Sequence, residues 1–187
     1  RGTVSAVAFY AFLLAETRSR RWRGQGAVPG ERHRLLWDNI AVWPATFKLP
    51  KIFAELGCSF PVDTYTSAWS GAFSPAEGLS GVARVYADIF LNLDVEAKVQ
   101  RMVEMARRYR LHGAVFHSNR SCKPYSLGQL EVKRRFTRRT GLPVLLLEAD
   151  MADPRHVDLD SVREEAATFV ALLKGRARRE RRVEVPR

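Results

Sequence analysis

The stretch 141-GLPVLLLEAD-150 decides the fold of this chain. Its apolar run, residues 144–147, follows a glycine and a proline and ends in two acidic residues. An unbroken apolar run of this length is typical of a strand in a parallel sheet, because helices cover such a strand on both faces. We therefore predict a buried parallel strand over residues 143–148.

Helix-like and strand-like segments alternate on the N-terminal side of this run. Residues 126–140 are predicted as a helix that Gly141 stops, and residues 113–117 as a strand. Asp94 can cap a further helix, because apolar residues recur on one helical face after it: Val95, Val99, Met102, Val103 and Ala106. Further upstream the pattern predicts helices over 4–23 and 45–56, strands over 34–37 and 59–65, and a loop over 69–81. Pro61 weakens the strand that contains it.

The C-terminal part of the chain carries its own helix signals. Ser161 and Glu164 are spaced as a capping box, and we expect the helix that follows them to end at Gly175. We divide the chain into an N-terminal helix (1–25), an α/β domain (26–175) and a basic C-terminal tail (176–187) that we expect to be frayed or disordered.

Together these segments predict a Rossmann-like α/β fold, with a doubly wound parallel sheet of about four strands and helices on both faces. In such sheets, ligands bind beyond the carboxyl ends of the strands, near the point where the strand order reverses. The loops to examine therefore begin at Asp38, Thr64, His117 and Asp150.

Composition narrows the classes of protein to consider. The net charge of +11 comes largely from basic clusters at 18–23, 133–139 and 176–182, which we expect to be solvated faces that form no specific nucleic-acid site. The longest apolar run, 4–15, is too short to cross a membrane. With two cysteines and no export signal, we expect a cytoplasmic protein. The chain does not begin with Met, which fits a piece of a longer protein.

The loop after the strand at 113–117 is dense in polar groups, with the sequence 117-HSNRSCKPYS-126. Cys122 lies between Arg120 and Lys123, just before a helix start. Cations and helix N-termini favour the thiolate form of a cysteine, which is the form that binds a metal or a cluster. The alternative is that Cys122 is a small, semi-buried thiol without a ligand.

Four segments, in order and with matching spacing, resemble the 2-hydroxyacyl-CoA dehydratase and benzoyl-CoA reductase family. They are HSNRSCKPYSLGQ at 117–129, GLPVLLLEADMADPR at 141–155, GAVPGERHRLLWDNIAVW at 26–43 and DTYTSAW at 63–69. The resemblance runs from about Gly24 to Leu173, and it is to the C-terminal portion of a subunit.

This resemblance implies part of an enzyme that is made of Rossmann-like domains, with a [4Fe-4S] cluster, a homologous second subunit and a separate ATP-dependent activator iron–sulfur protein. In the dehydratases, one electron converts the acyl-CoA thioester into a ketyl radical, water is lost, and 2-enoyl-CoA results. In the benzoyl-CoA-reductase type, the electrons stay and reduce the ring. A third reading, from another class, is a non-catalytic remnant that binds a partner or nucleic acid.

The resemblance also implies roles for individual residues. Cys122 lies in the Ser-Cys-Lys-Pro-Tyr-Ser motif and is the expected cluster ligand, whereas Cys58 matches no such motif and is expected to be a core thiol. A cluster needs several thiolates, so we expect the isolated fragment to be inactive. Residues expected to bind substrate or surround the cluster are Trp37, Asn39, His117, Asn119, Arg120, Ser121 and Lys123.

Each of these residues also has a structural reading. Trp37 could belong to the core, Asp38 could cap a turn, and His117 could be a core histidine whose hydrogen bonds are satisfied. Arg120 and Lys123 could hold CoA phosphates or tune the cluster. Asp150 and Asp153 could pair with Arg155, which would be a structural role. We further expect the Cys122 sulfur to point into an open cleft at the carboxyl edge of the sheet.

Overall fold

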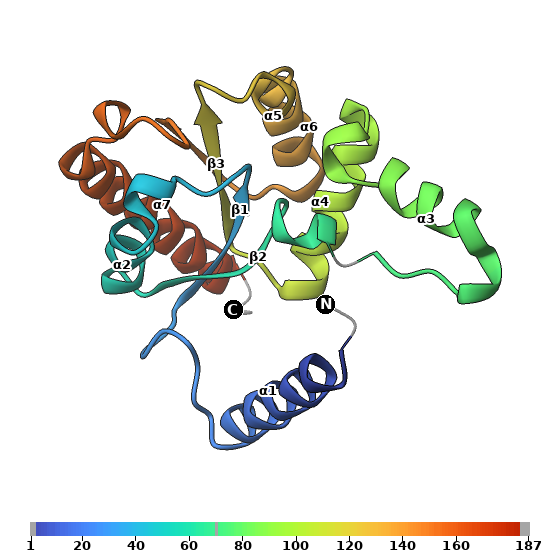
Figure 1. Cartoon of the computed structure of the whole chain (residues 1–187). Coiled ribbons are helices and arrows are strands. Elements are labelled where there is room, and N and C mark those ends of the chain that lie inside the picture. The colour runs from blue at the N-terminus through green and yellow to red at the C-terminus, as the bar shows by residue number, and fades with distance from the viewer. Residues whose placement is uncertain (1–2, 70, 184–187) are drawn as a thin grey trace.

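A four-stranded sheet forms the centre of the computed structural model, which describes residues 3–69 and 71–183 (Figure 1). The strand order is β2-β1-β3-β4, and neighbouring strands pair in parallel. The strands are β1 (His33–Asp38), β2 (Cys58–Asp63), β3 (Gly113–Asn119) and β4 (Val144–Ala149). This arrangement confirms the predicted parallel α/β sheet.

Helices cover both faces of the sheet, and each face has its own apolar cluster. On one face, α2 (Lys48–Glu55) and α7 (Leu159–Val183) pack over a cluster that includes Phe53, Val115 and Phe169. On the other face, the helices are α4 (Val95–Tyr109) and α6 (Gln129–Thr140), and their cluster includes Met102, Phe116 and Phe136. Because β1 and β3 are covered on both sides, their backbones form a rigid base for the loops at their ends.

The remaining elements are short or lie outside these layers: α1 (Val4–Trp22), α3 (Gly78–Ala87), α5 (Lys123–Ser126), and 3-10 turns at Trp43–Ala45, Thr66–Trp69, Pro75–Glu77, Phe90–Asn92 and Pro154–His156.

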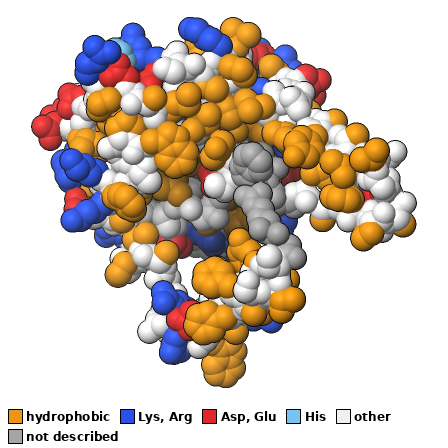
Figure 2. All heavy atoms as spheres, viewed as in Figure 1, with side chains coloured by type: hydrophobic (Ala, Val, Ile, Leu, Met, Phe, Trp, Pro, Cys, Tyr) orange, Lys and Arg blue, Asp and Glu red, His pale blue; other side chains and the backbone are white. Residues whose placement is uncertain are grey.

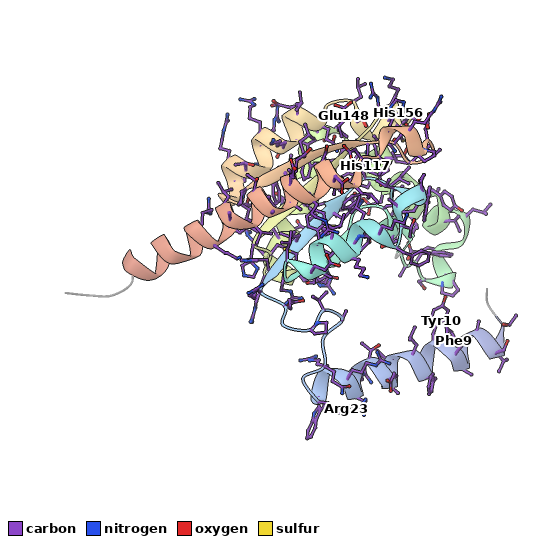
Figure 3. The ribbon with its side chains drawn as sticks, turned by 90° about the vertical axis from the view of Figure 1, so that its left-hand side faces the viewer. Phe9, Tyr10, Arg23, His117, Glu148 and His156 are labelled. Atoms are coloured by element: carbon purple, nitrogen blue, oxygen red, sulfur yellow. The ribbon has the colours of Figure 1, made fainter. Side chains whose placement is uncertain are left out.

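The helix α1 lies apart from the sheet and its covering helices in both views (Figures 1 and 3). The Thr3 hydroxyl accepts a hydrogen bond from the backbone of Ala6 and caps the start of α1, as expected for a Thr in that position. None of its residues is buried, although its first three turns are almost entirely apolar; Phe9 and Tyr10 are 60% and 64% exposed. The predicted helix over 4–23 is confirmed.

The edge strand β2 accommodates Pro61 by an irregular register. Arg34 pairs with Ser59, but Leu36 pairs with Val62, so the pairing shifts between them. Proline lacks an N–H group and is tolerated on edge strands and at such bulges.

Two predicted helices have different boundaries. The helix expected over 126–140 is divided into α5 and α6, because Gly128 takes a left-handed φ of 78° between them. The expected capping box of α7 is also wrong: Asp158 accepts hydrogen bonds from Asp160 N and from the Ser161 hydroxyl at the start of this helix.

Two segments expected to lack helix are helical. The loop expected over 69–81 is wrong in its second half, where a capping box of Ser74 and Glu77 starts the Pro75–Glu77 turn that leads into α3. The helix α7 does not end at Gly175 but continues to Val183, so the tail expected over 176–187 is helical as far as the structure describes it. Residues 184–187 of that tail lie outside the described residues.

The basic clusters differ in their surroundings. Residues 18–23 are exposed, as expected. In the second cluster, Arg134 and Arg135 pair with Glu131, and Arg139 pairs with Glu96 at 2.6 Å. Much of the charge at 133–139 is therefore balanced within the domain. Among the described residues, no helix is long and apolar enough to cross a membrane.

Candidate functional site

The topology places the candidate site between the carboxyl ends of β1 and β3. After β1, the chain forms β2 on one side of β1 and then crosses over to form β3 on the other side of β1. The strand order therefore reverses at the ends of β1 and β3, which is where parallel sheets bind ligands. Asn39 follows β1, and the loop with Cys122 follows β3.

Asn39 ties three strand ends together. It is fully buried and has a left-handed φ of 87°. Its side-chain Nδ2 donates to the His117 carbonyl oxygen at 2.8 Å, and its backbone N–H donates to the Thr64 hydroxyl at 3.0 Å. Its Oδ1 accepts from the backbone N–H of Ile40 at 2.7 Å. Asn39 therefore fixes the loop after β1 against the ends of β2 and β3.

Asp38 is also fixed by polar partners rather than acting as a turn cap. Its two carboxyl oxygens accept from the Thr64 hydroxyl and from Gln129 Nε2, both at 2.9 Å. Burial raises the pKa of Asp38, and the hydrogen bonds from Gln129 and Thr64 oppose this shift. Gln129 Nε2 also lies 3.1 Å from the His117 carbonyl oxygen. The first residue of α6 is thereby tied to β1 and β3. Thr64 and Gln129 were not among the predicted site residues.

His117 lies inside the domain with no exposed surface. Its Nδ1 is 2.8 Å from the Ile40 carbonyl oxygen, and its ring centroid is 5.8 Å from that of Trp37. Burial lowers the pKa of His117, and the hydrogen bond between Nδ1 and the Ile40 carbonyl oxygen opposes this shift. Nε2 has no hydrogen-bond partner among the described residues. His117 thus supports the loop that follows it from within the core.

We expect His117 to make folding stability dependent on pH. Because its folded pKa is below the ordinary 6.5, the unfolded chain takes up a proton first as the pH falls. This contribution to stability is present above pH 6.5 and is lost as the pH falls toward the folded pKa, at up to about 1.4 kcal/mol per pH unit. Urea unfolding of the wild type and His117→Gln between neutral and mildly acidic pH measures it. The pKa of His33 is also lowered by burial, so the difference between the two proteins isolates His117. Equal slopes of the unfolding free energy against pH for the wild type and His117→Gln would contradict this expectation.

A second polar network joins the loops after β3 and β4. The Asn119 Oδ1 accepts from the backbone N–H of Ser121 at 3.2 Å, and the Ser121 hydroxyl donates to the Asp150 carboxylate. Asp150 Oδ1 also accepts from the backbone N–H groups of Ala152 and Asp153 at 2.8 and 2.9 Å. These hydrogen bonds lower the pKa of Asp150, and the one from Ser121 has the largest effect. The Cys122 loop is thus held from the β4 side as well.

The predicted pairing of acidic residues with Arg155 is half right. Asp153 pairs with Arg155 at 2.7 Å, whereas the Asp150 carboxylate bonds to Ser121 and to the backbone after it. Asp150 therefore belongs to the loop network, and Asp153 has the structural role expected for both.

Cys122 occupies the position before the first residue of α5, at the carboxyl edge of the sheet as predicted. Its thiol is partly exposed, and one side packs against the apolar cluster of the α4–α6 face. The expected ends of the flanking elements need correction. β3 runs beyond His117 to Asn119, and α5 begins at Lys123 with Pro124 in its first turn, ahead of the helix predicted over 126–140. The Ser126 hydroxyl donates to the Asn119 carbonyl oxygen at 2.7 Å. Whether the sulfur faces an open cleft stays a prediction.

The two basic residues beside Cys122 are both exposed. Arg120 pairs with Glu148 at 3.3 Å, and its Nη1 is 3.4 Å from His156 Nδ1; Figure 3 shows Glu148 and His156 near His117 at this edge. Lys123 starts α5. Both side chains therefore reach solvent at the edge of the sheet.

The cysteines can supply one cluster ligand at this edge. Cys58 is the first residue of β2, so it lies at the amino ends of the strands, away from Cys122. It is 1% exposed, and burial raises its pKa to about 11. A strand of six residues separates the amino ends of the strands from their carboxyl ends by roughly 20 Å. No group of three potential ligands occurs among the described residues. Cys122 can therefore offer one thiolate at the carboxyl ends of the strands, and Cys58 has the expected core position.

The fold and the site define a class of protein: a Rossmann-like domain that presents one loop thiol at the switch point of a parallel sheet. Sequence comparison gives the family. Residues 1–171 match the family described as 2-hydroxyglutaryl-CoA dehydratase, D-component, and the chain belongs to this family.

Characterised relatives carry several related names. The chain is 30% identical over 156 residues to the (R)-2-hydroxyisocaproyl-CoA dehydratase alpha subunit of Clostridioides difficile, covering 83% of this chain and 38% of the relative. It is 30% identical over 160 residues to the alpha subunit of (R)-2-hydroxyglutaryl-CoA dehydratase from Acidaminococcus fermentans, covering 83% and 32%. It is 25% identical over 185 residues to the B subunit of benzoyl-CoA reductase from Thauera aromatica, covering 92% and 43%. The chain therefore spans less than half the length of these relatives.

Proposed function

We propose that this chain is the C-terminal portion of a subunit of a 2-hydroxyacyl-CoA dehydratase, in which Cys122 is one ligand of a [4Fe-4S] cluster. The observation that carries this proposal is the family match over residues 1–171 together with the position of Cys122 at the switch point of the sheet. The other thiolates would come from the remainder of the subunit, so the isolated chain would have no activity.

The proposed reaction removes water from a 2-hydroxyacyl-CoA. A [4Fe-4S] cluster held in part by Cys122 would supply one-electron chemistry at low potential, and the electron would come from an ATP-dependent activator iron–sulfur protein. With that electron the thioester carbonyl becomes a ketyl radical anion, which expels the 2-hydroxyl group as hydroxide. Loss of a proton from C3 and return of the electron then leave 2-enoyl-CoA, so that the net change is loss of water.

The residues of this chain would position the thiol and the thioester. Asn39 and Gln129 hold the strand ends through the His117 carbonyl, and Ser121 and Asn119 fix the loop before Cys122. Such rigid support keeps reacting groups in place during electron transfer and elimination. The exposed Arg120 and Lys123 would hold the CoA phosphates or tune the cluster. The Trp37 side chain would form one wall of the substrate-binding region.

The proposed setting is the cytoplasm, and the proposed partner is a homologous second subunit. The named relatives that are alpha subunits support a paired assembly. A second candidate function is ring reduction of the benzoyl-CoA-reductase type, which the match to the B subunit of that enzyme over 92% of this chain favours.

Dehydration by the assembled enzyme tests this function. The complete subunit pair, given its activator, ATP and a reductant, is expected to convert a 2-hydroxyacyl-CoA into 2-enoyl-CoA, with no turnover when the activator or ATP is left out. Liquid chromatography of the CoA esters follows the reaction. Reduction of benzoyl-CoA to a cyclic diene without dehydration would establish the second candidate, and neither reaction from a pair with full iron content would reject both.

A further inference from the structure

An apolar pocket of about 310 Å³ lies at the carboxyl ends of β1 and β2, next to the candidate site. Its walls include Trp37, Trp43, Leu49, Phe60 and Tyr65. The rings of Trp37 and Phe60 meet edge to face, with centroids 5.6 Å apart, and those of Trp43 and Tyr65 are 6.3 Å apart. In Figure 2, hydrophobic side chains gather over this end of the sheet. A pocket of this size and lining is typical of a small-molecule site.

The pocket is connected with the Cys122 loop through its walls. Asn39 lines it and donates to the His117 carbonyl oxygen at the end of β3. Tyr125, three residues after Cys122, is buried and approaches the Thr64 carbonyl oxygen with its hydroxyl at 3.4 Å. Tyr65, the residue that follows Thr64, lines the pocket. The pocket therefore lies at the carboxyl ends of the strands, and these hydrogen bonds join its walls to β3 and to the segment that follows Cys122.

The charge of the pocket wall restricts the ligand. Among the described residues that line the pocket, Asp63 is the charged one, and no Lys, Arg or His occurs. The Asp63 carboxylate accepts from the backbone N–H and the hydroxyl of Thr66, each at 2.5 Å, so it is held in place. A carboxylate brought into this pocket would lose water, find no cation and meet a like charge.

We propose that this pocket receives the acyl side chain of the CoA thioester and selects uncharged, branched aliphatic or aromatic groups over groups that end in a carboxylate. This inference rests on the proposed function, because it names the substrate class of the same site. The pocket offers apolar and aromatic surface to the side chain, and Asn39 stands between it and the end of β3.

Substrate competition in the complete subunit pair tests the selection. The kcat/KM for 2-hydroxyisocaproyl-CoA should exceed that for 2-hydroxyglutaryl-CoA by roughly a hundredfold, because the second carboxylate would be placed near the like charge of Asp63. Ala41→Phe, which places a ring in the pocket, should lower kcat/KM for 2-hydroxyisocaproyl-CoA and leave that for the small lactyl-CoA nearly unchanged. Phe47→Ala is the matched control, because Phe47 is 89% exposed and does not line the pocket. A preference for the glutaryl substrate, or an Ala41→Phe enzyme with unchanged kcat/KM values, would overturn the proposal.

A binding experiment separates the pocket from the proposed function. In the 187-residue chain, isocaproamide should shift the indole N–H resonances of Trp37 and Trp43, whereas the monoamide of glutaric acid should not. The indole of Trp22, 94% exposed on α1, is the internal control. If isocaproamide shifts neither resonance, or both amides shift them equally, the pocket assignment is wrong even if the pair dehydrates its substrate. If the shifts appear but a pair with full iron content dehydrates no substrate, the proposed function is wrong while the pocket assignment stands.

Discussion

Cys122→Ser is expected to remove the cluster from the complete subunit pair while leaving the fold intact. The iron and acid-labile sulfide bound at this site should fall to background, the visible absorbance of the cluster should disappear, and dehydration should stop. The reason is that Cys122 is the thiol of this chain at the carboxyl edge, and a serine hydroxyl is a poor substitute for a thiolate ligand of iron. Iron and sulfide analysis of the pair purified without oxygen measures the effect.

The matched control for this substitution is Cys58→Ala. Cys58 is buried in the core at the amino end of β2, away from Cys122. This change should therefore lower the free energy of unfolding by about 1 kcal/mol and leave the iron content unchanged. The melting temperature of Cys122→Ser should stay close to that of the wild type without its cluster, because a partly exposed loop thiol adds little packing. Full iron and full activity in Cys122→Ser would remove this residue from the mechanism.

Asn39→Ala should lower the free energy of unfolding by about 3 kcal/mol. The substitution removes the hydrogen bond to the His117 carbonyl and the acceptor of Ile40 N, and it leaves an alanine at a φ of 87°. Lost buried hydrogen bonds cost about 1 kcal/mol or more each, and the left-handed conformation costs alanine about 1 kcal/mol more than asparagine, whose polar side chain hydrogen-bonds the local backbone. Chemical denaturation of the 187-residue chain, followed by circular dichroism, measures the loss.

Asn39→Gly separates the two contributions. Glycine adopts positive φ without strain, so this variant should be about 1 kcal/mol more stable than Asn39→Ala and still less stable than the wild type. Equal stability of the alanine and glycine variants would show that the side-chain bonds carry the whole effect. A wild-type stability in both would mean that Asn39 serves the ligand site alone.

The sheet could be predicted from the sequence because its signals are local. The apolar run at 144–147 and the helix cap at Asp94 each describe their own segment, and both appear in the structure. The helix α3 could not be predicted in this way, because glycine, serine and proline dominate its start and outweighed the capping box of Ser74 and Glu77. At Gly175, the cost of one glycine in a helix, about 1 kcal/mol, was too small to end α7 among good helix formers.

The candidate site was predictable in its position but not in its internal contacts. The polar run 117–126 follows a buried strand, and this placed Cys122 at the carboxyl edge. The bond between Gln129 and Asp38 joins residues 91 positions apart, and no local pattern announces such a pair. The same holds for Asn39 and the His117 carbonyl, 78 positions apart. Side-chain pairing across the sheet depends on register, which the chain sets only when it folds.

The exposed apolar surface of α1 makes the stability of this helix depend on the concentration of any protein surface that covers it. No residue of α1 is buried within this chain, although the helix belongs to the matched family region, 1–171. Any protein surface that covers α1 binds the folded helix in preference to the unfolded segment, and it therefore stabilises this helix by mass action. At a hundredfold excess of that surface over its dissociation constant, the gain is about 2.7 kcal/mol. The helical content of residues 4–22 in the isolated chain is thus a lower bound on its value in an assembly that covers the helix.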